Sequence, residues 1–292
     1  MHLPRPFLAG LDRRRWLMAV GGLTGAAVLS RSSLAEAGTS GLRTISYNVL
    51  ACRGYPETDA NRERLVGARD RMVERFAIEL AVYNADVVTF QESPSEAMVA
   101  SIAKAMGRHY TYFPGGFPGA VISRFEIVES ENCPLVEGPR PPDLFTRHWG
   151  RAVLRMGGER LTVYSAHLHP SNVEVRAREV GLALERMAAD IAGPDPMLFQ
   201  GDLNHRPDGP EMARWREAGL VDAVTRSGDA SELTFPSTVP VQCIDYIWSN
   251  AALARRLSGA RVLFEGAFRT NPADERSFAL SDHLPVLADY RG

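Results

Sequence analysis

Acidic and amide side chains stand directly after short apolar runs in this sequence. Glu92 follows the run at residues 86–90, and Asp202 and Asn204 follow the run at residues 197–200. Runs of this length predict buried strands, and proteins place reactive groups at the ends of such elements. Alone, Glu92 would be a turn residue near the positive end of the next helix. Together the three residues predict one polar pocket, in which a carboxylate can serve as a base or a metal ligand.

Two histidines and two further carboxylates occupy similar positions. His167 stands at the exit of a predicted strand, and Asp282 and His283 lie immediately before the last one, residues 284–290. Asp245 lies inside an apolar run, where an ionised carboxylate needs a partner if it is buried. An imidazole would satisfy it, so the sequence predicts a histidine–carboxylate pair suited to proton transfer.

The elements that must position these side chains alternate between helix-like and strand-like segments. Apolar residues at helical spacing predict a helix over residues 62–83, and capping boxes at 93–96 and 171–174 predict a helix after each. Asp208 can cap a further helix that stops near Gly219. Strands are predicted at residues 42–49, 86–90, 110–113, 120–123, 127–131, 151–156, 161–166, 197–200, 244–248, 261–264 and 284–290. Two packed sheets flanked by helices would accommodate this order of strands and helices.

The first 37 residues differ from the rest of the chain. A weakly polar run at residues 19–29 follows Arg13-Arg14 and precedes Ala35-Glu36-Ala37, an order that resembles a twin-arginine export signal. The alternative is a membrane anchor, but the run is shorter than the ~20 apolar residues that a spanning helix needs. We therefore expect cleavage after Ala37, with the twin-arginine translocase as the partner and the periplasm or the cell exterior as the destination.

Residues 38–292 are predicted to form a single domain, since no repeat or low-complexity tract interrupts them. The composition, 45% hydrophobic and 23% charged, is that of an ordinary globular protein. Loss of residues 1–37 would remove five arginines against two acidic residues and move the net charge from −2 to about −5. An acidic protein is poorly suited to tight nonspecific binding of nucleic acid. Three cysteines, Cys52, Cys133 and Cys243, allow at most one disulfide.

Six short motifs give the sequence a resemblance to a known family. They occur in the order found in endonuclease/exonuclease/phosphatase proteins, and together they span essentially the whole predicted domain. The motifs are Ser46-Tyr47-Asn48, Gln91-Glu92, Ser165-Ala166-His167-Leu168, Gly201-Asp202-Leu203-Asn204, Ile244-Asp245-Tyr246 and Ser281-Asp282-His283. The resemblance implies a four-layered α/β/β/α sandwich, in which two mixed β-sheets pack face to face with helices outside and the active site lies at one end of the sheets.

The resemblance also implies a divalent-metal site. Glu92 would be the principal ligand, and Asn48 and Asp282 would complete it. Carboxylate and amide oxygens are the hard donors that Mg²⁺ or Mn²⁺ prefers. The expected cofactor is therefore Mg²⁺ or Mn²⁺.

The remaining matched residues would carry the chemistry. By resemblance, Asp202 would position or deprotonate the attacking water, and Asn204 would hold the phosphate or the transition state. His283, oriented by Asp245, would hydrogen-bond a phosphoryl oxygen or act as an acid or base. His167 would protonate the leaving oxygen, and it separates this chain from members similar to abasic-site endonucleases, which have Tyr here. Members similar to deoxyribonucleases, sphingomyelinases and inositol phosphatases have His.

These observations favour an exported phosphodiesterase that acts on a small or lipid phosphodiester, and we expect it to be a monomer. An exported nuclease is the alternative, although no run of Lys or Arg in residues 38–292 predicts a groove for nucleic acid. A phosphomonoesterase is less favoured. A binding protein that has kept the fold without catalysis would be expected to have lost several of these polar residues.

Overall fold

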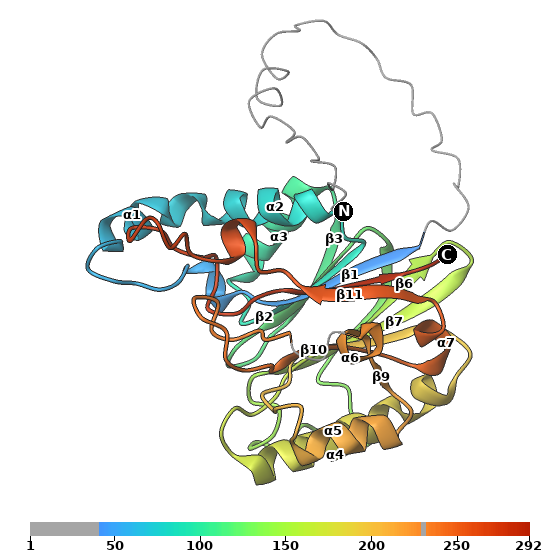
Figure 1. The fold of residues 1–292 in the computed structure, drawn as a ribbon. Coiled ribbons are helices and arrows are strands. Elements are labelled where there is room, and N and C mark those ends of the chain that lie inside the picture. Colours follow the sequence, from blue (N-terminus) through green and yellow to red (C-terminus); the bar gives the residue numbers. More distant parts are fainter. Residues whose placement is uncertain (1–40, 229–231) are drawn as a thin grey trace, which may run out of the picture. The chain divides into compact units, whose positions relative to one another are not determined.

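The computed structural model describes residues 41–228 and 232–292. The predicted export signal, residues 1–37, lies outside the described residues, and its role stays a prediction. Within the described part, the strands form two six-stranded sheets (Figure 1). In neither described range does a helix combine the length and the apolar content that a membrane span needs.

The first sheet has the strand order β11-β12-β1-β2-β4-β3. Strands β1 and β2 are parallel and the other neighbours are antiparallel, so the sheet is mixed. Its strands are β1 (Leu42–Asn48), β2 (Val87–Gln91), β3 (His109–Phe113), β4 (Gly119–Ser123), β11 (Leu257–Val262) and β12 (Val286–Tyr290).

The second sheet has the order β5-β6-β7-β8-β10-β9. It is also mixed, because β7 and β8 are parallel while their other neighbours are antiparallel. Its strands are β5 (Glu126–Asn132), β6 (His148–Met156), β7 (Glu159–His167), β8 (Met197–Asp202), β9 (Val221–Asp222) and β10 (Asp245–Ser249).

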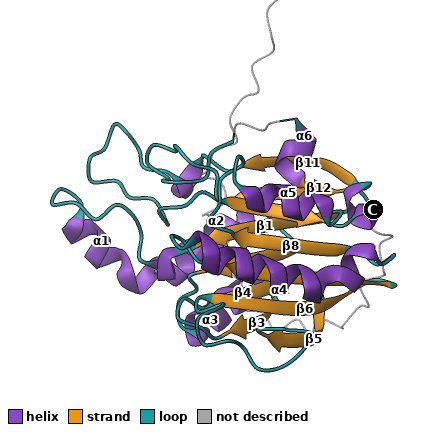
Figure 2. Ribbon diagram, turned by 90° about the horizontal axis from the view of Figure 1, so that it is seen from below, coloured by secondary structure: helices purple, strands orange, loops and turns teal. Residues whose placement is uncertain are grey.

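Helices cover the outer face of each sheet, and α4 and α5 lie along the second one (Figure 2). The α-helices are α1 (Arg62–Ala68), α2 (Met72–Tyr83), α3 (Glu96–Met106), α4 (Val173–Ala192), α5 (Pro210–Glu217), α6 (Ala223–Ser227) and α7 (Ala251–Ala254). Three-residue 3-10 turns occur at η1 (Leu50–Cys52), η2 (Arg69–Arg71) and η3 (Gly266–Phe268).

Three apolar clusters hold these layers together. One joins α2 and α3 to the first sheet, and a second joins α4 and α5 to the second sheet. The third lies between the two sheets and includes Val87 and Val121 from one and Leu161 and Leu198 from the other. The predicted four-layered α/β/β/α sandwich is therefore confirmed.

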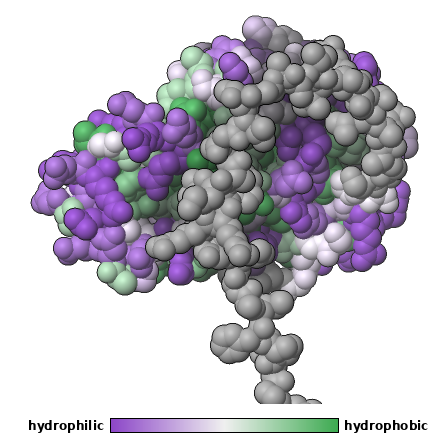
Figure 3. Space-filling view, turned by 90° about the horizontal axis from the view of Figure 1, so that it is seen from above, coloured by the Kyte–Doolittle hydropathy of each residue, from purple (hydrophilic) through white to green (hydrophobic). Residues whose placement is uncertain are grey.

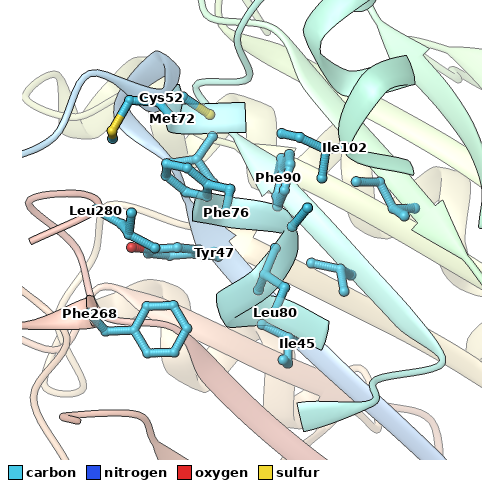
Figure 4. Close-up of a cluster of buried hydrophobic side chains, with 14 of the residues drawn as sticks. Ile45, Tyr47, Cys52, Met72, Phe76, Leu80, Phe90, Ile102, Phe268 and Leu280 are labelled. Atoms are coloured by element: carbon cyan, nitrogen blue, oxygen red, sulfur yellow. The ribbon is translucent and has the colours of Figure 1, made fainter. Parts of the chain in front are cut away.

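Strand alternation in β1 points successive side chains to opposite faces of the sheet. Tyr47 points into the outer cluster, where its ring centroid lies 5.9 Å from that of Phe76 and 5.4 Å from that of Phe268 (Figure 4). Phe76 is fully buried, and its truncation to Ala is expected to cost about 3–5 kcal/mol of stability. Because Tyr47 faces the helices, its neighbour Asn48 faces the second sheet.

The layer between the sheets becomes polar toward the ends of β1 and β2. Gln200 of the second sheet accepts a hydrogen bond from Thr44 Oγ1 at 3.0 Å and donates one to Thr89 Oγ1 at 3.0 Å. All three residues are fully buried. These bonds join the two sheets next to the predicted site without leaving buried amide atoms unpaired.

Helix boundaries differ from the sequence prediction at four places, one of which is the start of α5, where the cap is Gly209 rather than Asp208. The predicted helix over residues 62–83 is broken by η2, next to Gly67 and a charged stretch that supplies no apolar side chain to the core. Helix α3 is capped by Ser95 rather than at residue 93, and α4 is capped by Asn172, whose side chain accepts from Glu174 N and Val175 N. Both predicted capping boxes are therefore wrong, although both helices exist.

Hydrophilic residues dominate the coloured part of the face above the first sheet, including the region of α1 (Figure 3). In α1, Arg62, Glu63 and Arg64 are exposed, while Leu65 is buried. This helix therefore packs on the core through Leu65 and presents charged side chains to water.

Candidate active site

Strand pairing gathers the predicted polar residues at one end of the sandwich. In the first sheet, Asn48 ends β1 opposite Gln91, so Glu92 follows directly beside it. In the second sheet, the register pairs Asp202 with His167 on one side and with Asp245 on the other. Because β1/β2 and β7/β8 are parallel pairs, their carboxyl ends meet and bring these side chains together.

Asp202 lies at the centre of the site. Its Oδ2 atom lies 3.0 Å from Nδ2 of Asn48, 3.3 Å from Nε2 of His167 and 3.7 Å from Nε2 of His283. Its Oδ1 atom accepts a hydrogen bond from the backbone N–H of Asn204 at 3.2 Å. Burial raises the pKa of Asp202 to about 7, although the positive charge of His283 opposes that shift. One carboxylate therefore joins four other predicted residues.

His283 is held between two carboxylates. Its Nδ1 atom lies 2.9 Å from Oδ2 of Asp245, and both residues are buried. Burial disfavours the charged ring, but the charges of Asp245 and Asp202 outweigh it and raise the pKa of His283 to about 10. The ring is thus an imidazolium at neutral pH, and it donates its Nδ1–H to Asp245.

Glu92 sits in strained backbone at the end of β2. Its φ is +47°, and the adjacent turn Leu50, Ala51 and Cys52 has φ values of +47°, +49° and +57°. Non-glycine residues adopt this left-handed conformation at a cost of about 1 kcal/mol or more each. The backbone N–H of Ala51 donates to the carbonyl oxygen of Glu92 at 2.7 Å. The strained turn therefore fixes the backbone from which the Glu92 carboxylate projects.

His167 is buried and neutral in this structure. Burial lowers its pKa well below the usual value, and the charge of Arg147 lowers it further. Nη1 of Arg147 lies 2.7 Å from Nε2 of His167, so the ring accepts at Nε2 and carries its proton at Nδ1. Among the described residues, the Nδ1 atom has no hydrogen-bond partner. The Nδ1–H group is therefore a buried donor that the described residues leave unpaired, which is rare in folded proteins.

Arg147 is a site residue that the sequence did not predict. Besides His167, its Nη1 atom faces Oε1 of Glu92 at 3.6 Å, and its guanidinium lies over the ring of Phe117 at 4.2 Å. Two other arginines of the chain are held in ion pairs elsewhere: Arg124 pairs with Asp86 at 2.6 Å, and Arg151 pairs with Glu129 at 3.0 Å. Its position in the sequence could have indicated a role, because Arg147 immediately precedes β6, which pairs with β7, the strand that ends at His167.

Asn204 joins the ends of β7 and β8. It has a φ of +53°, and its Nδ2 atom donates to the carbonyl oxygen of Leu168 at 3.0 Å. Since its backbone N–H also binds Asp202, both ends of this residue are fixed. Asn204 therefore holds the loop after β8 against the loop that follows His167.

Asp282 is the predicted residue with the weakest connection to the others. Its side chain accepts from Ser281 Oγ at 3.2 Å, and within residues 41–228 and 232–292 no hydrogen bond or ion pair joins it to Glu92 or Asn48. It is partly exposed, and its charge contributes to the raised pKa of His283. Direct contacts link all the other predicted site residues into one network.

Two groups of donors could hold a divalent cation. Ligand atoms of Asp202, Asp245 and His283 lie within 4.8 Å of one another. The protonated ring of His283 is bonded to Asp245, whereas a metal needs a neutral imidazole. Glu92 fits better, because its side chain is 20% exposed and Nδ2 of Asn48 holds its carboxylate at 3.4 Å. Carboxylate and amide oxygens are hard donors, which suit Mg²⁺ or Mn²⁺.

The part of the chain that contains these residues matches a known protein family. The model of the endonuclease/exonuclease/phosphatase family matches residues 45–283, a range that contains the whole site. The uncharacterized protein YbhP of Escherichia coli (strain K12) is 27% identical over 186 residues, which cover 63% of this chain and 67% of that protein.

Solved structures share the fold at low sequence identity. The mannosyl-6-phosphatase Bt3783 of Bacteroides thetaiotaomicron superposes with a TM-score of 0.67 and 22% identity, over 85% of this chain and 98% of that one. Humanized D. rerio TDP2 with 14 mutations gives a TM-score of 0.65 and 20% identity, over 87% of this chain and 100% of that one. At such identities the likeness supports the fold alone.

Proposed function

Because the chain belongs to the endonuclease/exonuclease/phosphatase family, we propose that it is a phosphodiesterase that hydrolyses a small or lipid phosphodiester with Mg²⁺ or Mn²⁺. Family membership makes the chain a metal-dependent hydrolase of phosphate esters. The observation that carries the finer proposal is the position of the His283 ring between Asp245 and Asp202, with Asn48 linking Asp202 to the partly exposed carboxylate of Glu92.

The cation would be held by Glu92 together with Asn48 and Asp282. When bound, a divalent cation supplies charge that neutralises a phosphoryl oxygen. Asn48 is suited to a second task, because its Nδ2 atom donates to both Glu92 and Asp202. It thereby fixes the position of the Glu92 carboxylate relative to the Asp202 carboxylate.

Asp202 and His283 would handle the attacking water and the phosphoryl oxygen. Asp202 is ionised at pH values above its raised pKa of about 7. Its carboxylate can then orient water or accept a proton from it. The Nε2–H of the charged His283 can donate to a phosphoryl oxygen as negative charge develops there. Asp245 fixes the ring orientation through Nδ1.

His167 and Arg147 would act on the other side of the phosphate. The guanidinium of Arg147 offers charge and several N–H donors to phosphate oxygens. An anionic substrate beside His167 would raise the depressed pKa of this ring and let it protonate the leaving oxygen. Such acid catalysis contributes about 10²–10⁴-fold.

The substrate class is supported by charge. Loss of residues 1–37 leaves a net charge of about −5, which disfavours long polyanions. The fold itself serves varied substrates, since one structural relative is described as a mannosyl-6-phosphatase and another as a TDP2 complexed with single-strand DNA product. A small or lipid diester needs few cationic contacts beyond Arg147, in keeping with this acidic chain.

Export through the twin-arginine route also belongs to this proposal, with residues 38–292 as a monomeric mature enzyme in the periplasm or outside the cell. It is supported by Arg13-Arg14 and by Ala35-Glu36-Ala37. Replacement of both arginines by lysine should retain the full-length precursor in the cytoplasm. Amino-terminal sequencing of the exported form should begin at Gly38, and equal export of the double-lysine variant would contradict the proposal.

The test of the activity is a substrate panel. Purified protein would be assayed with Mg²⁺, Mn²⁺ or Ca²⁺ against bis-aryl phosphate, aryl phosphate, sphingomyelin, inositol phosphates and DNA. We expect diesters other than DNA to rank first and EDTA to abolish turnover. Glu92→Gln should lose about 10²-fold, because the negative charge of a metal ligand is removed, whereas Glu96→Gln, an exposed neighbour in α3, should not. A preference for DNA would favour a nuclease, and undiminished activity in EDTA would overturn the proposal.

A further inference from the structure

A buried carboxylate lies behind the site, on a helix that supplies none of the predicted catalytic residues. Glu179 is in α4 and is 1% exposed. Its Oε1 atom accepts from the backbone N–H of Phe145 at 2.7 Å, and its Oε2 atom accepts from the backbone N–H of His169 at 2.8 Å. Each oxygen of this one side chain therefore holds a different loop.

The first loop leads into Arg147. Phe145, two residues before it, has a φ of +49°, so its backbone is strained. Three contacts hold it in place: the bond to Glu179, the bond of Arg140 Nη1 to its carbonyl oxygen at 3.0 Å, and stacking of its ring on Trp149 at 5.8 Å. This strained residue sets the direction in which the chain carries Arg147 toward the site.

The second loop leads away from His167. His169 lies two residues after it, and Arg176 donates to the carbonyl oxygen of His169 at 3.0 Å. Arg176 is itself buried and paired with Glu211 at 2.7 Å. Glu179 and Arg176, one turn apart on α4, thus bind the N–H and the carbonyl of the same residue.

We propose that Glu179 is a positioning residue that holds Arg147 and His167 at their 2.7 Å separation by binding both of the loops that carry them. The proposal rests on the proposed function, in which these two side chains act on one phosphate. Strand pairing aligns His148 with His167, but Arg147 lies outside β6, and its backbone needs another support.

A carboxylate suits this task better than its neutral counterpart. Two backbone N–H groups point at the side chain, and a carboxylate offers an acceptor to each. A glutamine would offer one oxygen and set its NH₂ group against the second N–H. Glu179→Gln should therefore release one loop while nearly preserving shape and volume.

The experiment is a double-mutant cycle in kcat and KM on bis-aryl phosphate with Mg²⁺. Glu179→Gln should lower kcat about tenfold with little change in KM, because a small displacement of Arg147 weakens transition-state contacts more than substrate binding. In an Arg147→Ala background the same change should cost less than in the wild-type background, since one of its two targets is gone. Additive losses would overturn the proposal, as would a kcat of Glu179→Gln equal to that of the wild type.

Two further variants separate positioning from general stability. Asp222→Asn changes another buried carboxylate, which accepts from Val224 N and Thr225 Oγ1 far along the chain from both loops. It should lower stability and leave kcat unchanged. Arg140→Gln, at an exposed residue, releases the carbonyl of Phe145 without threatening the fold, and because Arg140 holds only the loop of Arg147, its loss of kcat should vanish in the Arg147→Ala background.

Hydrogen exchange gives a readout that needs no turnover. Glu179→Gln should speed amide exchange in at least one of the segments 145–147 and 167–169, and Asp222→Asn should not. If the wild-type protein hydrolysed none of the probes, the proposed function would fail. Hydrogen exchange would still show whether Glu179 holds the two loops in place. Unchanged exchange in both segments would overturn that role.

Discussion

Nδ1 of His283 lies 2.9 Å from Oδ2 of Asp245, while Nε2 of the same ring lies 3.7 Å from Oδ2 of Asp202. The ring therefore has one side fixed in the protein and one side toward the centre of the site. Asp245 is buried and is paired in register with Asp202 across β8 and β10. In the proposed mechanism Asp245 therefore orients His283 and does not touch the substrate.

Replacement of Asp245 by Asn should separate orientation from binding. The amide cannot stabilise the charged ring, so we expect kcat to fall by about 10²–10⁴-fold with KM nearly unchanged. Steady-state kinetics on a bis-aryl phosphate would measure both. Asp289→Asn is the matched control, because Asp289 pairs with Arg43 at the other end of the first sheet. Equal losses in the two variants would show that the effect is structural.

Arg147→Lys tests whether the guanidinium acts at the site. A lysine keeps the charge but cannot reach His167 and Glu92 with a planar set of donors. We expect kcat to fall by about 10²-fold, in the range found when one transition-state donor is removed. Arg124→Lys, at a residue paired with Asp86, should retain full activity. A kcat for Arg147→Lys within twofold of wild type would remove Arg147 from the mechanism.

Most of the site was predictable because its residues follow strands with clear apolar patterns. Asn48, Glu92, His167 and Asp202 all stand at the exits of parallel strands, and parallel pairing brings such exits together. Asp245 was recognisable as a charge within an apolar run that needs a partner. Local sequence and one topological rule were enough for these residues.

Arg147 and Glu179 could not be predicted in the same way. Arg147 follows a segment without periodicity, and its position depends on the pairing of β6 with β7 and on the strained Phe145. Glu179 looks like an ordinary charged position on an amphipathic helix. Its burial arises only when two loops, from residues 34 and 10 positions away, bring their N–H groups to it. Long-range packing, which the local pattern does not encode, decides both.

A pH dependence of stability is expected from His205. This buried ring accepts a hydrogen bond from Trp215 Nε1 at 3.0 Å, and burial lowers its pKa to about 4. Below pH 6.5 the unfolded chain binds a proton that the folded chain resists, so stability present at pH 7 is lost as the pH falls toward 4. By pH 5 the loss should be about 2 kcal/mol from this residue.

Urea unfolding at pH 7 and pH 5 would measure that loss. His205→Gln can still accept from Trp215 but does not titrate, so the difference in unfolding free energy between the two pH values should shrink by about 2 kcal/mol. His109→Gln changes an exposed histidine and serves as the control, with the difference preserved. An unaltered difference in His205→Gln would show that other groups set the acid sensitivity.

The strained turn beside Glu92 predicts a substitution that stabilises the protein. Ala51 has a φ of +49°, which glycine adopts without the clash that its methyl group causes. Ala51→Gly should raise the free energy of unfolding by about 0.5–1 kcal/mol, since relief of strain exceeds the added freedom of the unfolded chain. Ala189→Gly, on an exposed face of α4, should instead lower it by about 1 kcal/mol. Urea unfolding of the two variants measures the effect of the same Ala→Gly change in left-handed and in right-handed backbone. A loss of stability in both variants would mean that the turn stores no strain.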